Sequence, residues 1–68
     1  MSKKCYDIVF HGNDGSNCKG FEETFEYCKD YIKMYNGTNE SYFSDYKGGV
    51  VQIVNVINGD VDYEEEID

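Results

Sequence analysis

Apolar side chains recur with a helical period over residues 21–35. Phe21, Phe25, Cys28, Ile32 and Tyr35 are separated by four, three, four and three positions, so they share one face of a helix. Charged residues occupy most of the remaining positions in this stretch. We therefore predict an amphipathic helix whose apolar face packs against the rest of the chain.

Turn and capping residues bound the predicted helix. Gly20 is the expected N-cap, and Glu23 falls at the third helical position, where a carboxylate can reach back to the cap. Asn36-Gly37 is expected to end the helix, because glycine readily adopts the left-handed conformation found there.

Alternating apolar and polar residues predict a first strand over residues 4–11. Tyr6, Ile8 and Phe10 fall on one face of this strand, which we expect to contact the helix. Residues 12–16 are typical of a turn. Residues 17–20 are compatible either with a short return strand or with a loop that leads into the helix.

The C-terminal half predicts a hairpin. Residues 50–57 are β-branched and apolar on both faces, which is typical of a central strand. Asn58-Gly59 is a strong hairpin signal, and residues 60–67 alternate as a returning strand. Residues 38–47 are a polar connection, whose aromatic residues we expect to cover an edge of the core after one short turn.

These elements predict a single α+β domain over residues 1–68. Its sheet is mainly antiparallel with three or four strands, in the order β-α-β-β or β-β-α-β-β, and one helix packs on one face. The other face would expose an apolar strip suited to a homodimer or a partner, unless the loops with Tyr42 and Phe43 cover it. We favour covering by the loops. The expected strip contains Val9, Val51, Ile53 and Ile57.

Acidic residues concentrate at the C-terminal end. Fourteen Asp and Glu residues oppose six Lys, giving a formal net charge of −8, and residues 60–68 contain six acids and no base. Such a surface repels nucleic acids and anionic membranes and attracts basic proteins. We therefore expect a partner protein with a basic surface, and neither direct nucleic acid binding nor membrane binding.

The C-terminal acids are the candidate partner-binding site. Alternate residues of a strand lie about 6.6–6.8 Å apart on one face, comparable to successive phosphates of one nucleic acid strand. Asp62, Glu64, Glu66 and Asp68 would form such a row, and tyrosines would add rigid anchors. A solvated acidic tail that maintains solubility is the alternative. The predicted partner-binding residues are Asp60, Asp62, Tyr63, Glu64, Glu65, Glu66, Asp68, Tyr42 and Tyr46.

No catalytic, metal or cofactor site is predicted. His11 would need Cys18 or Asp14 as a catalytic partner, and no nucleophile motif accompanies it, so we expect a strand-end histidine and no enzymatic activity. The glycines at 12–20 match no phosphate-binding pattern. His11, Cys18 and Cys28 lack the close paired spacing of structural zinc sites. The odd number of cysteines without C-x-x-C spacing, and the lack of an apolar signal after MSKK, favour reduced thiols in the cytoplasm.

In general character, the chain resembles the small acidic proteins with which bacteriophages and mobile elements block host defence enzymes, including DNA mimics. The shared features are a short single domain, an acid-loaded outer strand, surface tyrosines and the lack of a catalytic motif; no functional residue is carried over. The resemblance implies a non-enzymatic inhibitor in the host cytoplasm that occludes a basic, nucleic-acid-binding surface. One alternative is a small dimeric binder that sequesters a nucleotide-like ligand through Lys19, Lys29 or Lys47. Another is a small enzyme centred on His11 and Cys18.

Overall fold

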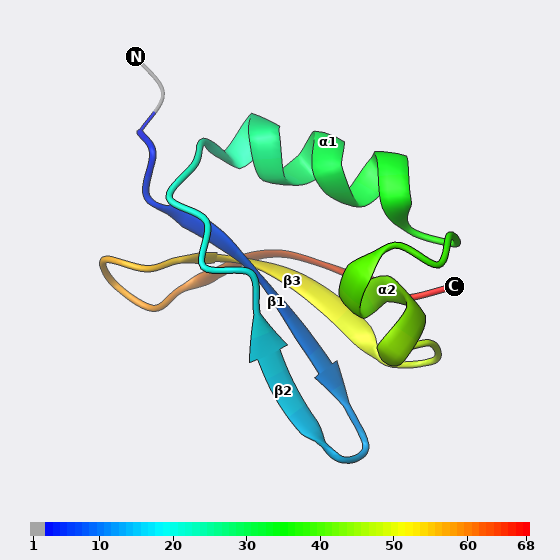
Figure 1. The fold of residues 1–68 in the computed structure, drawn as a ribbon. Coiled ribbons are helices and arrows are strands. Elements are labelled where there is room, and N and C mark those ends of the chain that lie inside the picture. Colours follow the sequence, from blue (N-terminus) through cyan, green and yellow to red (C-terminus); the bar gives the residue numbers. More distant parts are fainter. Residues whose placement is uncertain (1–2) are drawn as a thin grey trace.

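The computed structural model describes residues 3–68, the side chain of Ser41 excepted, and shows an antiparallel sheet with helices on one face (Figure 1). The sheet order is β2-β1-β3-β4, and every neighbouring pair is antiparallel. This confirms the predicted α+β fold. The elements are β1 (Tyr6–Gly12), β2 (Gly15–Cys18), α1 (Phe25–Tyr35), α2 (Ser41–Asp45), β3 (Val50–Asn55) and β4 (Val61–Glu66).

The short return strand exists, and it begins earlier than residues 17–20. Gly12 pairs with Gly15, so only Asn13 and Asp14 form the turn between β1 and β2. Gly15 has a φ of 134°, a conformation that glycine adopts without strain. The resulting hairpin extends beyond the part of the sheet that α1 covers (Figure 1).

The core lies between the sheet and the helices. β1 contributes Ile8 and Phe10, and α1 contributes Cys28 and Ile32, all with no exposed surface. Phe43 of α2 completes this core with an edge-on ring contact to Phe10 at 4.9 Å between centroids. The aromatic connection therefore covers the core edge with one short turn, as predicted.

Val51 and Ile53 were expected on the uncovered face, and that prediction is wrong. Ile53 pairs with Ile8, and Val51 pairs with Phe10, so both β3 residues face α1 and are fully buried. The sequence of β3 is apolar on both faces, so its alternation alone does not determine which residues point toward the helix.

The helix starts later than predicted. Thr24, not Gly20, is the N-cap, and its hydroxyl accepts a hydrogen bond of 3.0 Å from the Tyr27 backbone N–H. Residues 21–23 precede the helix, and Glu23 forms an isolated β-bridge with Tyr6. The predicted C-terminal end is confirmed, because Asn36 is the C-cap and Gly37 has a φ of 91°.

The connection between β3 and β4 is longer than a two-residue turn. Asn55 Oδ1 accepts hydrogen bonds from the backbone N–H groups of Ile57 and Asn58, at 2.9 and 3.4 Å. These side-chain contacts satisfy the backbone in place of further strand pairing. β3 therefore ends at Asn55 rather than at Ile57, and Ile57 is exposed in the turn.

Candidate functional site

The face of the sheet opposite α1 is the candidate functional site, and we call it the open face. Its residues alternate with the buried ones, and the strand register brings them together. They include polar, acidic and small apolar side chains. The open face consists of Val9, His11, Ser16, Cys18, Val50, Gln52, Val54, Glu64 and Glu66.

A row of side-chain hydrogen bonds crosses all four strands of the open face. His11 Nδ1 lies 2.5 Å from Ser16 Oγ on β2, and His11 Nε2 lies 2.7 Å from Gln52 Oε1 on β3. Gln52 Nε2 then donates a hydrogen bond of 2.7 Å to Glu64 Oε1 on β4. The register explains this row, since His11 pairs with Ser16 and Gln52 pairs with Glu64.

The charge of Glu64 determines the direction of these hydrogen bonds. An ionised carboxylate only accepts, so the Gln52 amide nitrogen donates to it and the Gln52 oxygen faces His11. His11 Nε2 must then carry a proton, and in the neutral ring Nδ1 accepts from the Ser16 hydroxyl. All donors point toward Glu64, so the row stabilises the carboxylate's negative charge.

Sequence reasoning missed Ser16 and Gln52 as partners of His11. It considered Cys18 and Asp14 instead, yet both His11 ring nitrogens are hydrogen bonded to Ser16 and Gln52. The available signal was the hairpin itself, because His11 and Ser16 flank the paired glycines of the turn symmetrically. The contact between Ser16 and His11 joins a hydroxyl and an imidazole, the groups of a nucleophile and a base, and it lies on the surface of the sheet.

The acidic row of β4 is interrupted by an irregularity. The pairing with β3 shifts between Ile53 and Val54, so Asp62 is the extra residue of a β-bulge. A hydrogen bond to Asp62 raises the pKa of the Tyr6 hydroxyl, and the Tyr6 ring packs against Phe25 of α1. The prediction that Asp62 continues the row of Glu64 and Glu66 is therefore wrong.

Glu65 faces the helix side of the sheet. It accepts hydrogen bonds from the Tyr63 hydroxyl and from the Nδ2 atom of Asn36, the C-cap residue of α1. The bond to Glu65 raises the pKa of Tyr63, because the carboxylate stabilises the protonated hydroxyl. Asn36 also bonds the backbone of Glu66 and Asp68, which fixes the end of the chain beside α1.

The predicted tyrosines also lie on the helix side. Tyr42 and Tyr46 contact the Phe10 ring at 5.5 and 6.1 Å between centroids. Tyr63 contacts the Lys29 ammonium group, which lies 4.3 Å from its ring centroid. Of the nine predicted partner-binding residues, Glu64 and Glu66 lie together on the open face. The rings of Tyr42, Tyr46 and Tyr63 instead make contacts within the chain on the helix side.

The strands of the sheet contain acidic residues but no lysine, whereas the rest of the chain contains both. The four strands contain five acids and no lysine: Asp7, Asp62, Glu64, Glu65 and Glu66 are their charged residues at neutral pH. All six lysines lie outside the strands. The Lys19 ammonium group, for example, lies 5.5–5.9 Å from the ring centroids of Phe21, Tyr31 and Tyr42 on the helix side.

Within residues 3–68, no three His, Cys, Asp or Glu side chains are grouped in a way that could hold a metal ion. Over the same residues, neither α1 nor α2 has the length and apolar content needed to cross a bilayer. Cys5 and Cys28 are buried free thiols, whereas Cys18 is exposed on the open face. Comparison with protein-family models, curated proteins and solved structures finds no match to this chain.

Proposed function

We propose that this chain is a non-enzymatic interaction protein whose open face binds and occludes a basic, nucleic-acid-binding surface of another protein. The charge of the open face carries the proposal, since Glu64 and Glu66 are its acidic residues and the strands contain no lysine. Glu64 and Glu66 point to the same side of β4, about 6.6–6.8 Å apart. They are the central charged contacts of the proposed interface.

The hydrogen-bonded row supports this role by fixing the polar groups in advance. Gln52 holds Glu64, and His11 holds Gln52, so these side chains lose little freedom when a partner binds. Val9, Val50 and Val54 lie beside the row and add apolar contact area. Binding would be steered by long-range attraction and would weaken as salt concentration rises.

The class we propose is the inhibitor type used by bacteriophages and mobile elements, acting in the host cytoplasm. The alternative of a nucleotide-sequestering dimer receives less support from the geometry. It requires Lys19, Lys29 or Lys47 to meet phosphate. Lys29 is stacked over Tyr63, Lys19 lies among three aromatic rings, and Lys47 Nζ donates to the Asp68 carbonyl oxygen at 3.4 Å. The interaction protein is therefore the function that the described contacts favour.

An affinity capture experiment tests the proposal. The immobilised chain is incubated with a bacterial lysate, and bound proteins are eluted with increasing salt or with duplex DNA. We expect a nucleic-acid-binding protein that elutes at high salt and is displaced by the DNA, because both compete for its basic surface. Capture that is insensitive to salt and to DNA would contradict the proposal.

A further inference from the structure

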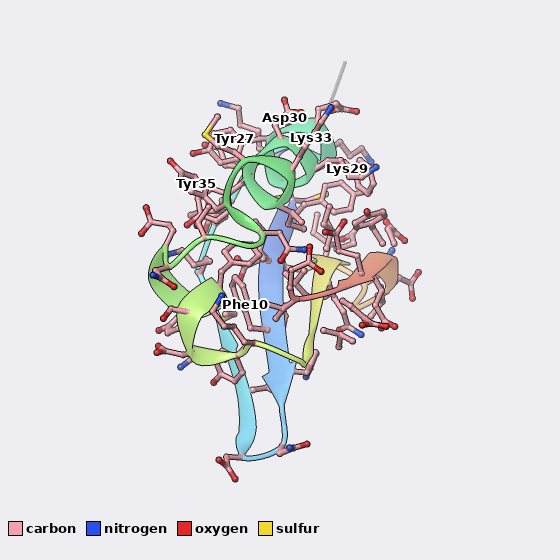
Figure 2. All side chains as sticks on the ribbon, turned by 90° about the vertical axis from the view of Figure 1, so that its right-hand side faces the viewer. Phe10, Tyr27, Lys29, Asp30, Lys33 and Tyr35 are labelled. Atoms are coloured by element: carbon pink, nitrogen blue, oxygen red, sulfur yellow. The ribbon has the colours of Figure 1, made fainter. Side chains whose placement is uncertain are left out.

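A second surface, on the outer side of α1, has a different chemical character. Three tyrosines at helical spacing and two further residues line a shallow groove of about 360 Å³. Figure 2 shows Tyr27 and Tyr35 on one side of α1 and Lys29 and Lys33 on the other, with Asp30 between them. The groove residues are Tyr27, Asp30, Tyr31, Met34 and Tyr35.

The groove is exposed yet preorganised. Tyr27 is 46 % exposed and Met34 is 67 % exposed, although solvent-facing helix positions are usually polar. The rings brace one another: Phe21 makes edge-on contacts with Tyr27 and Tyr31, and the centroids of Tyr31 and Tyr35 lie 4.7 Å apart. Rigid exposed tyrosines with a flexible methionine are typical of interface hot spots.

We propose that this groove binds an arginine side chain of a basic protein partner. A guanidinium group stacks on a tyrosine ring and forms paired hydrogen bonds with a carboxylate, and the groove offers both through Tyr27 and Asp30. The Met34 side chain suits the apolar stem of arginine. The same chain already holds cations against rings, since the ammonium groups of Lys19 and Lys29 lie 4.3–5.9 Å from aromatic centroids.

Charge complementarity selects this occupant. The chain carries a formal net charge of −8, and Asp30 is the charged residue that lines the groove. α1 covers one face of the sheet, whereas Glu64 and Glu66 lie on the open face opposite to it. The groove is therefore separate from the open face. Arginine binding by the groove and partner binding by the open face can be tested independently.

Titration with N-acetylarginine amide, followed by NMR on the full chain, tests this proposal. We expect saturable shifts of the Tyr27, Tyr31 and Tyr35 ring signals and of the Met34 methyl signal. N-acetylcitrulline amide has nearly the same shape without the charge, so it should bind detectably more weakly. Equal shifts with the two compounds, or shifts confined to the open face, would overturn the proposal.

Two matched variants separate the role of Asp30 from a general effect of charge. Asp30→Asn should weaken arginine binding by about two- to fivefold, as expected for an exposed ion pair. Asp14→Asn removes the same charge in the exposed β1–β2 turn and should leave binding unchanged. Backbone signals outside α1 verify the fold of both variants, so an Asp30→Asn variant that is folded and binds like the original chain would refute the assignment.

Discussion

The side-chain amide of Asn36, at the end of α1, donates a hydrogen bond of 2.6 Å to Glu65 Oε2 on β4. The same side chain donates to the Glu66 carbonyl oxygen at 2.8 Å and accepts from the Asp68 backbone N–H at 2.9 Å. One residue thus caps the helix and holds the last strand. The helix end therefore adds three side-chain hydrogen bonds to the pairing with β3 that positions the acidic strand.

We predict that Asn36→Ala destabilises the fold by about 1–3 kcal/mol, since three hydrogen bonds of its side chain are lost and one involves a carboxylate. Urea denaturation gives the free energy of unfolding. Asn39→Ala, in the exposed connection after α1, is the control and should change stability by less than about 0.5 kcal/mol. Equal stability of the two variants would disprove this role of Asn36.

Asp7 should be the most sensitive polar residue of β1. Its buried carboxylate accepts backbone hydrogen bonds from Ile8, Gly20 and Phe21 at 2.7, 3.1 and 2.8 Å, which holds the segment between β2 and α1. Asp7→Ala leaves these N–H groups without their acceptor, so we expect a loss of about 2–4 kcal/mol in unfolding experiments. Asp7→Asn keeps one acceptor oxygen and should cost less. A loss below about 0.5 kcal/mol for Asp7→Ala would contradict this account.

Substitution of Thr24 tests the observed start of the helix. Thr24→Ala removes the hydroxyl that accepts from the Tyr27 N–H, and we expect a cost of about 0.5–2 kcal/mol. Thr24→Ser retains an equivalent hydroxyl and should stay close to the original stability. Both values come from thermal or urea unfolding. If the helix instead began at Phe21, the two variants would have similar stability.

Cys28 links stability to alkaline pH. Burial, aided by the nearby charges of Asp7 and Glu23, raises the pKa of its thiol from the usual 9.0 to about 11. The unfolded chain therefore releases this proton first, so the contribution to stability is fully present below pH 9 and is lost as the pH rises toward 11. Urea titrations across this range should show a steeper fall for the original chain than for Cys28→Ala. Identical pH dependence of the two proteins would contradict the prediction.

The buried residues could be predicted from the sequence where only one face of an element is apolar. The alternation of Ile8 and Phe10 and the helical spacing of Cys28 and Ile32 identified four fully buried residues. β3 was ambiguous because both of its faces are apolar, and the helix start was predicted too early because Gly20 is also an acceptable cap. Local pattern cannot choose between such options, whereas tertiary contacts can.

The site was harder to predict than the fold because it depends on register. A β-bulge changes the direction of the Asp62 side chain, and the alternation of residues in β4 does not predict this bulge. The partnership of His11 with Gln52 joins residues 41 positions apart, so it exists only once β1 and β3 are aligned. The clustering of acids at the C-terminal end, by contrast, was visible from composition alone.

The most direct test of the central claim compares two charge reversals of equal size. Glu64→Lys/Glu66→Lys changes the open face, whereas Glu22→Lys/Glu40→Lys changes two exposed residues outside the strands, and each pair shifts the formal net charge of −8 by the same four units. Glu65 is left intact in both variants because it binds Asn36 and Tyr63.

The measurement is the dissociation constant for the captured nucleic-acid-binding protein at several salt concentrations. We predict that the open-face reversal weakens binding at least about tenfold and flattens its salt dependence, while the control reversal has a much smaller effect. Equal weakening by both variants would show that only overall charge matters, and it would contradict the claim that the open face is the binding surface.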